Sequence, residues 1–205
     1  MNPFDNPKQF WNEKYATGSF IYGERPNKYF KDQLDKLKPG RLLLPAEGEG
    51  RNAVYAACCG WEVDAFDISS AGRQKALKLS ERHGVSIRYM NTGYNEFVII
   101  PEFYNAIGLI YAHMHEDARR EMHRKLVTGL RPGGTLILEA FANEQIHYES
   151  GGPKDEAMLY SREELAEDFE ALRLLTLDKC ETTIDEGPHH QGRAVVIRIT
   201  ARIQE

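Results

Sequence analysis

One stretch decides the fold: Leu42-Leu43-Leu44-Pro45-Ala46-Glu47-Gly48-Glu49-Gly50-Arg51-Asn52. Its three consecutive leucines predict a buried parallel strand. The glycine-rich residues that follow predict a tight turn, and the segment 51–57 predicts the start of a helix. A strand, a glycine turn and a helix N-terminus in this order expose backbone N–H groups to an anionic or carboxylate-bearing small molecule.

An acidic residue, Asp67, follows the glycine turn in the sequence. It lies seventeen residues after Gly50, at the end of a second apolar strand predicted over 61–67. A carboxylate at that position can accept hydrogen bonds from a ribose diol. The bland alternatives are an ordinary strand-to-helix turn and a surface or helix-capping aspartate. Because ligands of open α/β sheets lie at the carboxyl ends of the strands, the pair favours a nucleoside-containing cofactor.

The central part of the chain alternates between strand and helix patterns. Such alternation predicts a parallel sheet with helices on both faces. Arg131-Pro132-Gly133-Gly134 is expected to form a sharp turn before the fifth strand. The expected strands cover 41–45, 61–67, 85–90, 106–111 and 135–141, and the expected helices cover about 50–59, 71–82 and 116–130.

The two ends of the chain differ from this centre. Asp5 or Asn6 is expected to cap a helix that begins at Pro7, and Asn27 to cap a second helix over 28–38. Residues 142–160 have no clear period, and Ser161 with Glu164 forms a capping box for a further helix. Two long strands over 174–184 and 193–203 predict an antiparallel hairpin. We expect a single domain over 1–205.

Composition narrows the possible partners. The 26 basic and 31 acidic residues give a net charge of −5, which argues against nucleic acid. No apolar run is long enough to predict a membrane span. The three cysteines, of which Cys58 and Cys59 are adjacent, do not resemble a disulfide framework, so we expect a cytoplasmic protein. The spacing of the cysteines and histidines predicts no metal site.

These motifs together resemble the class I S-adenosylmethionine-dependent methyltransferases, over almost the whole chain. Residues 42–50 match in part that family's pattern hydrophobic-hydrophobic-acidic-hydrophobic-Gly-x-Gly-x-Gly, and Asp67 matches its second acidic position. The segment 130–138, LRPGGTLIL, is similar to the family's lead into its fifth strand. The resemblance implies an α/β fold: a Rossmann-like three-layer αβα sandwich whose seven-stranded, mostly parallel sheet ends in an antiparallel hairpin.

Within that family the chain is most similar to the small tellurite-resistance and thiopurine-type methyltransferases. The similarity rests on Phe10-Trp11-Asn12-Glu13-Lys14-Tyr15, on Phe20-Ile21-Tyr22-Gly23 and on the helix start Gly50-Arg51-Asn52-Ala53. It implies that residues 1–39 form a helical lid over the cofactor. The irregular insertion 142–160 is then expected to close over the methyl acceptor.

The resemblance also implies a cofactor, S-adenosylmethionine, and a small-molecule acceptor such as a thiol, a metalloid oxyanion or another small nucleophile. Residues 46–50 would hold the methionine end, Asp67 the ribose, and Ile68 with residues 92–94 the adenine. Glu47 is expected either to start the helix or to approach the methionine amino group. The candidate cofactor-binding residues are Tyr22, Gly23, Ala46, Glu47, Gly48, Gly50, Asn52, Asp67, Ile68, Gly93, Tyr94 and Tyr111.

The sequence departs from the family pattern at three positions. Leu44 replaces an acidic residue, Ala46 replaces the first glycine, and Gly93 stands where a third acidic residue is usual. Backbone donors from residues 47, 48 and 94 do not depend on side-chain identity and are expected to persist. Ala46 is compatible with the turn only at negative φ, because a Cβ makes positive φ costly.

Several histidines are candidates for chemistry. His113 follows the predicted fourth strand, and its imidazole makes it the candidate base for an oxygen or nitrogen acid. A soft sulfur or metalloid anion would need no base. His147, His189 and His190 are expected to be loop residues, and adjacent histidines chelate one ion poorly.

Two other functions compete with methyl transfer. A non-catalytic protein that binds S-adenosylmethionine on the same scaffold is one, motivated by the departures at positions 44, 46 and 93. A nicotinamide-dependent oxidoreductase is the other. It requires Gly-x-Gly-x-x-Gly, whereas this turn reads Ala-x-Gly-x-Gly.

Overall fold

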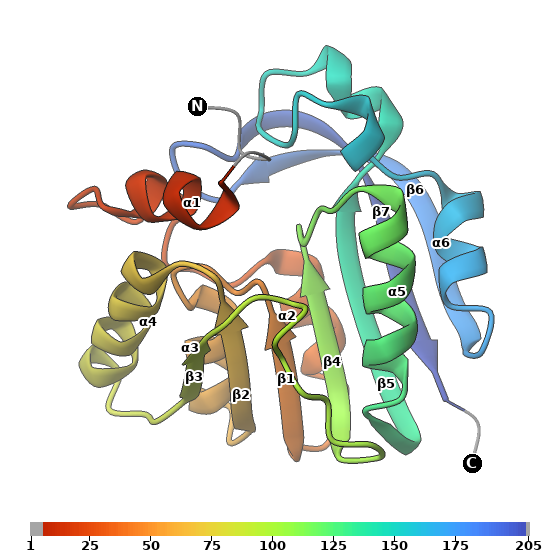
Figure 1. Ribbon diagram of the computed structural model, residues 1–205, viewed down its shortest axis with the longest axis horizontal. Helices are drawn as coiled ribbons and strands as arrows, with labels where there is room; N and C mark the ends of the chain where they lie inside the picture. The colour runs from red at the N-terminus through yellow and green to blue at the C-terminus, as the bar shows by residue number, and fades with distance from the viewer. Residues whose placement is uncertain (1–5, 204–205) are drawn as a thin grey trace.

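The computed structural model describes residues 6–203, whose strands form one seven-stranded sheet in the order β3-β2-β1-β4-β5-β7-β6 (Figure 1). Neighbouring strands from β3 to β5 pair in parallel, and β7 pairs antiparallel with both β5 and β6. The sequence prediction of a parallel sheet that ends in a hairpin is therefore confirmed. The strands are β1 (Arg41–Pro45), β2 (Glu62–Asp67), β3 (Arg88–Asn91), β4 (Tyr104–Ile110), β5 (Leu130–Phe141), β6 (Arg173–Asp185) and β7 (Gln191–Arg202).

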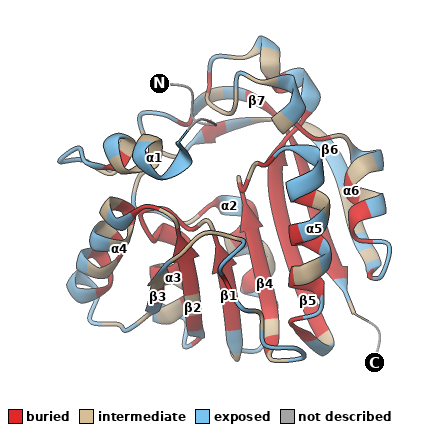
Figure 2. Cartoon of the chain, viewed as in Figure 1, coloured by how far each residue is buried: buried red, intermediate tan, exposed pale blue. Residues whose placement is uncertain are grey.

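Helices cover both faces of this sheet. In β1, Leu42 and Leu44 pack in the core shared with α2, α3 and α4, whereas Leu43 packs in the core shared with α5 and α6. This alternation follows from the two-residue period of a strand. Figure 2 shows buried residues along the strands and exposed residues on the outer sides of the helices. The helices are α1 (Pro7–Tyr15), α2 (Lys28–Leu34), α3 (Arg51–Cys58), α4 (Ser70–Arg82), α5 (Glu116–Val127) and α6 (Arg162–Asp168).

Side-chain caps fix where the helices begin. Asn6 accepts a hydrogen bond from the Gln9 amide at the start of α1, and Asn27 accepts one from the Phe30 amide at the start of α2. Asp5, the alternative cap, lies outside the described residues. Helix α2 ends at Leu34, four residues before the predicted end, because the amide of residue 37 bonds the carbonyl of residue 34 in a tighter turn.

Strand β5 begins earlier than predicted. Leu130 already pairs with Tyr104 of β4, and the next registered pair is Thr135 with Ala106. The segment 131–134 therefore forms a bulge within the strand, with Gly133 at a φ of 73°, rather than a turn between separate elements.

The insertion that follows β5 lies at the top of the sheet in Figure 1. The insertion 142–160 contains two short 3-10 helices, η1 (Asn143–His147) and η2 (Glu156–Met158). The side chain of Gln145 accepts a hydrogen bond from the Val195 amide at 2.9 Å, which attaches the insertion to β7.

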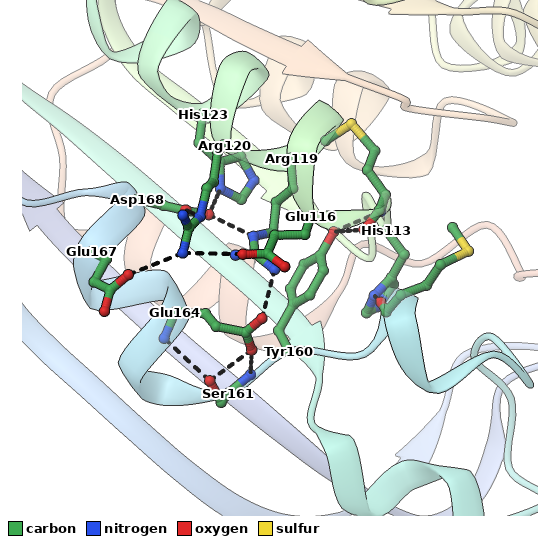
Figure 3. Close-up of polar contacts among 12 residues, drawn as sticks. His113, Glu116, Arg119, Arg120, His123, Tyr160, Ser161, Glu164, Glu167 and Asp168 are labelled. Carbon is green, nitrogen blue, oxygen red and sulfur yellow. Dashed lines mark hydrogen bonds and ion pairs between the residues drawn. The ribbon is translucent and has the colours of Figure 1, made fainter.

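A buried ion-pair cluster joins α6 to α5 (Figure 3). The Arg119 guanidinium donates to Asp168 at 2.7 Å and to Glu164 at 3.0 Å, and the ring of His123 lies 2.7 Å from Asp168. The side chain of Arg119 is 1% exposed and that of Asp168 is fully buried. Glu164 also completes the predicted capping box with Ser161.

Within the described part of the chain, no helix has the length and apolar character that crossing a membrane requires.

Candidate functional site

The order in which strands are added to the sheet reverses between β1 and β4, and a strained residue follows each of these two strands. Successive strands run outward from β1 on one side and from β4 on the other. Open α/β sheets bind ligands at the carboxyl ends of the strands beside such a point. Ala46, after β1, has a φ of 50°, and Tyr111, after β4, has a φ of 53°. The prediction of negative φ at Ala46 is wrong. Each such residue costs about 1–2 kcal/mol, and strain of this kind concentrates at functional sites.

The glycine turn and the acidic residue are in direct contact. The Gly48 amide donates to the Asp67 carboxylate at 3.0 Å, and the Ser69 amide donates to its other oxygen at 2.8 Å. Asp67 lies at the tip of β2 and is 7% exposed. Burial raises its pKa to about 6, although the two amides oppose the shift. The two features that suggested a nucleoside site therefore form one unit.

The backbone of the turn is not free in the way that the sequence predicted. The Glu47 amide donates to the Phe66 carbonyl at 3.2 Å, and the Gly48 amide is already bonded to Asp67. Both amides are therefore hydrogen-bonded within the protein, and their role as ligand donors stays a prediction. They attach the turn to β2.

Glu47 and Asn52 have structural partners. The Glu47 carboxylate accepts hydrogen bonds from the amides of Asn52 and Ala53 at 2.8 Å and from the Asn52 side chain at 3.2 Å. The Asn52 side chain in turn accepts a bond from the Asn27 amide. Of the two roles left open for Glu47, the geometry favours the helix-start acid. The contact predicted between the Asn52 side chain and a cofactor is not supported, because both ends of that side chain are occupied.

Gly50 is required by packing. Its φ is 87°, and a Cβ built on it would lie 2.4 Å from the Cβ of Ala76 in α4. Gly50 therefore holds α3 close to α4 and has no shown role toward a ligand.

We expect Gly50→Ala to lower the free energy of unfolding by about 2 kcal/mol or more, from backbone strain and overpacking together. Gly84→Ala is the matched control, because Gly84 has a similar φ of 66° but nothing within 4 Å of its Cβ position. That variant should lose only about 1 kcal/mol. Urea unfolding of both variants measures the difference, and equal losses would contradict the packing role of Gly50.

The predicted adenine-binding residues lie together beyond β2 and β3. A Cβ built on Gly93 would lie 3.7 Å from Ile68. The Tyr94 ring packs edge-on against Phe66, with centroids 5.6 Å apart. Among the described residues, the buried hydroxyl of Tyr94 has no hydrogen-bond partner. Burial, with the nearby Tyr160 and Asp67, raises the pKa of Tyr94. An unpartnered buried hydroxyl beside Asp67 fits a site that a polar ligand completes.

The N-terminal segment covers the turn. A Cβ built on Gly48 would lie 2.6 Å from the Tyr15 hydroxyl, so this ring rests on the turn. The Glu49 carboxylate accepts hydrogen bonds from the amides of Ile21 and Tyr22 at 2.9 and 3.3 Å. Gly23, at a φ of 70°, follows directly. Tyr22 and Gly23 thus lie beside the turn, and their action as a lid stays a prediction.

The side chain of Lys14 lies among aromatic rings in the same segment. The ammonium of Lys14 is 4.9 Å from the ring centroid of Trp11 and 5.4 Å from that of Tyr22. Lys14 forms no ion pair with a carboxylate among residues 6–203. Burial lowers its pKa. Nothing in the sequence distinguished Lys14 from a solvated helix residue.

Both ring nitrogens of His113 contact backbone groups of the protein. Its Nδ1 lies 2.7 Å from the Met158 carbonyl, and its Nε2 accepts a hydrogen bond from the Phe141 amide at 3.1 Å. Both nitrogens of a neutral ring are therefore occupied, and burial lowers the pKa of His113 to about 4. The general-base role predicted for His113 is not supported by this geometry. The ring instead fastens the insertion to β5.

Sequence reasoning missed His190, which is buried and not an ordinary loop residue. Its ring lies 4.4 Å from Tyr22, 4.8 Å from Tyr111 and 5.3 Å from Phe141, measured between centroids. Tyr111 also donates from its hydroxyl to Glu139 at 2.8 Å. The predicted cofactor residue Tyr111 thus belongs to an aromatic cluster with Tyr22, Phe141 and His190.

An open cavity of about 810 Å³ lies away from the predicted cofactor residues, none of which lines it. Its walls come from the start of α5, the two 3-10 helices and Glu164, and they carry five carboxylates. Among residues 6–203, no group of three or more histidine, cysteine or acidic residues is arranged to hold a metal ion.

No protein-family model matches the sequence, and no curated protein matches it. Solved structures share its architecture. One, from a study of the conversion of a disulfide bond into a thioacetal group during echinomycin biosynthesis, has a TM-score of 0.79 at 14% identity, over 97% of this chain and 93% of that chain. TehB from Haemophilus influenzae has a TM-score of 0.72 at 16% identity, over 96% and 67%. The N-methyltransferase NodS from Bradyrhizobium japonicum WM9, in complex with S-adenosylhomocysteine, has a TM-score of 0.72 at 15% identity, over 98% and 100%.

The chain therefore has the fold of the class I S-adenosylmethionine-dependent methyltransferases, with TehB among its structural neighbours. The resemblance predicted from the sequence is confirmed at the level of the fold.

Proposed function

We propose that this protein binds S-adenosylmethionine at the carboxyl ends of β1 and β2 and transfers its methyl group to a small-molecule acceptor. The observation that carries the proposal is the contact between the Gly48 amide and the Asp67 carboxylate at 3.0 Å, at the edge where this fold binds ligands. A bound sulfonium would supply an already activated methyl group, so the protein has to position the acceptor and exclude water.

Residues that follow β2 and β3 are proposed to hold the ribose and the adenine of the cofactor. The Asp67 carboxylate would accept hydrogen bonds from the ribose hydroxyls with the lone pairs that the two amides leave free. The Tyr94 hydroxyl, which has no partner among the described residues, would gain one from the ligand. Ile68 and Gly93 would flank the adenine, as the sequence resemblance implies.

Lys14 is proposed to meet the carboxylate at the methionine end. Its ammonium lies among aromatic rings that also border Tyr15, the residue resting on Gly48. A half-buried cation with no carboxylate partner in the described chain is stabilised when an anion binds beside it.

Replacing Lys14 with glutamine should weaken S-adenosylhomocysteine binding about tenfold, the value of one charge-assisted hydrogen bond of about 1.5 kcal/mol. Methylthioadenosine has no carboxylate, so its affinity should not change. Lys8→Gln is the control, because Lys8 is exposed on the same helix. Calorimetry with both ligands separates the outcomes, and an equal loss for the two ligands would exclude Lys14 as the carboxylate partner.

The competing proposal is a non-catalytic protein that binds the same cofactor. The departures from the family pattern at Leu44, Ala46 and Gly93 motivate it. Incubation with methyl-labelled S-adenosylmethionine and a panel of thiols, phenols, selenite and tellurite tests the choice. Transfer of label to any acceptor supports the enzyme, and binding without transfer supports the alternative.

A further inference from the structure

The turn between β6 and β7 carries a buried histidine, His190. His190 is 5% exposed, and its Nδ1 makes no hydrogen bond within residues 6–203. Its Nδ1 lies 3.8 Å from the Glu186 carboxylate, too far for a hydrogen bond but close enough for electrostatic attraction. His113, by contrast, has both nitrogens bonded. A buried ring nitrogen without a hydrogen-bond partner requires an explanation.

Glu186 is held in its ionised form beside that ring. Its carboxylate accepts hydrogen bonds from Arg51 at 2.7 Å and from the Asn27 side chain at 2.8 Å. Burial opposes ionisation, but His190 and Arg51 hold the pKa of Glu186 at about 2. A carboxylate at this distance stabilises the positive charge that the ring gains with a proton.

The surroundings of His190 favour its neutral form. Burial lowers its pKa first, and the positive charges of Arg51 on α3 and Lys14 on α1 add to this effect. Glu186 alone among these charged groups opposes the shift. The other titratable groups around the ring are the phenols of Tyr22 and Tyr111 and the imidazole of His113. Neutral imidazole is the form that can accept a proton.

The other side of the ring faces the insertion. A Cβ built on Gly151 would lie 3.2 Å from Nε2 of His190, and one on Gly152 would lie 2.8 Å from the Phe141 ring. Both glycines have positive φ, at 128° and 90°. Their lack of side chains allows the loop to cover the aromatic cluster closely. The insertion therefore covers the buried ring of His190.

We propose that His190, whose ring lies beside the Glu186 carboxylate, is the base that receives the acceptor's proton, and that the acceptor is a neutral acid on an aromatic ring, of the phenol type. This inference rests on the proposed function. The acceptor oxygen forms a bond to the methyl carbon, and the carbon–sulfur bond breaks with its electron pair moving to sulfur, which becomes a neutral thioether. The phenolic proton passes to Nε2 of His190 and then to solvent. Tyr22, Tyr111 and Phe141 supply the aromatic surface for the acceptor.

The test compares two acceptors of different acidity, 4-methylphenol and 4-methylthiophenol, at pH 8. The thiol is ionised there and needs no base. For His190→Gln, we expect kcat/KM to fall about a hundredfold with the phenol and less than about threefold with the thiol. His189→Gln is the matched control, because the neighbouring His189 is exposed, and both of its rates should be unchanged. Equal losses with the two acceptors, or no loss, would overturn the proposal.

Two measurements on the wild-type protein keep the test independent of how the variant folds. In nitrogen NMR of the S-adenosylhomocysteine complex, the His190 ring should be neutral at pH 7. Its pKa should lie below the ordinary histidine value of about 6.5. A charged or ordinarily titrating ring would overturn the role of His190. Calorimetry with S-adenosylhomocysteine reports separately on the cofactor. Absence of binding would refute the proposed function itself, whereas binding without methylation of either probe would refute the acceptor class alone.

Discussion

Asp67→Asn is expected to lower the affinity for S-adenosylhomocysteine about a hundredfold, close to 2.7 kcal/mol. The carboxylate is proposed to accept two hydroxyl hydrogen bonds from the ribose, and charge-assisted bonds of this kind contribute about 1.5–3 kcal/mol. Methylthioadenosine has the same ribose and should lose as much, in contrast to its behaviour with the Lys14 variant. Calorimetry at pH 8 measures both ligands.

The pH dependence gives a second readout of the same prediction. Because burial raises the pKa of Asp67 to about 6, the free protein protonates this group as the pH falls through 6. Ligand affinity should therefore be constant above pH 7 and decline below pH 6 in the wild type, and the decline should be absent in Asp67→Asn. Glu62→Gln serves as the control, because Glu62 lies at the opposite end of β2 with a 75% exposed side chain. Unchanged affinity in Asp67→Asn would remove the proposed ribose contact.

Arg119→Ala is expected to lower the free energy of unfolding by about 3–5 kcal/mol, because it removes the buried guanidinium that bonds the buried Asp168 carboxylate at 2.7 Å. Arg119 is the cation that bonds both Asp168 and Glu164 across the α5–α6 contact. Arg120→Ala is the matched control, since the side chain of Arg120 is 40% exposed. Its loss should stay below about 1 kcal/mol. Urea unfolding at pH 7 compares the two neighbours.

The cluster should also shape the response to acid. Burial opposes the ionisation of Asp168, but bonds from His123 and Arg119 hold its pKa below the usual range. A carboxylate whose pKa is lowered in the folded state stabilises the protein at pH values above its unfolded-state pKa of about 3.9. This stabilisation is lost as the pH falls through its folded-state pKa. The wild type should therefore lose stability below pH 4 more steeply than Arg119→Ala. Similar losses for the two arginine variants at pH 7 would contradict the buried ion pair.

The architecture could be predicted because its signals are local. The leucine run of β1, the Asn27 cap and the Ser161–Glu164 capping box each specify a structure within a few residues. The antiparallel hairpin followed from two long strand patterns. The early start of β5 could not be predicted in this way, because the bulge at 131–134 depends on pairing with β4.

The candidate site was harder to predict, since burial of its histidines depends on contacts between distant segments. Gly187, at a φ of 92°, packs so closely that a Cβ there would lie 2.4 Å from the Gly23 amide. This contact brings His190 under the N-terminal segment, and no local pattern reveals it. His113 was predicted to be a base because its structural partners, Met158 and Phe141, lie in other elements and cannot be identified from the local sequence. Ala46 has a positive φ although a residue with a Cβ favours a negative one. Such exceptions concentrate at functional sites.

The most direct test of the central claim is a crystal structure of the protein with S-adenosylhomocysteine. The account predicts ribose hydroxyls within hydrogen-bond distance of the Asp67 carboxylate, a new partner for the Tyr94 hydroxyl, and the sulfur directed toward the cluster of Tyr22, Tyr111 and His190. A ligand bound in the acidic cavity beside α5, or no ligand at saturating concentration, would contradict it.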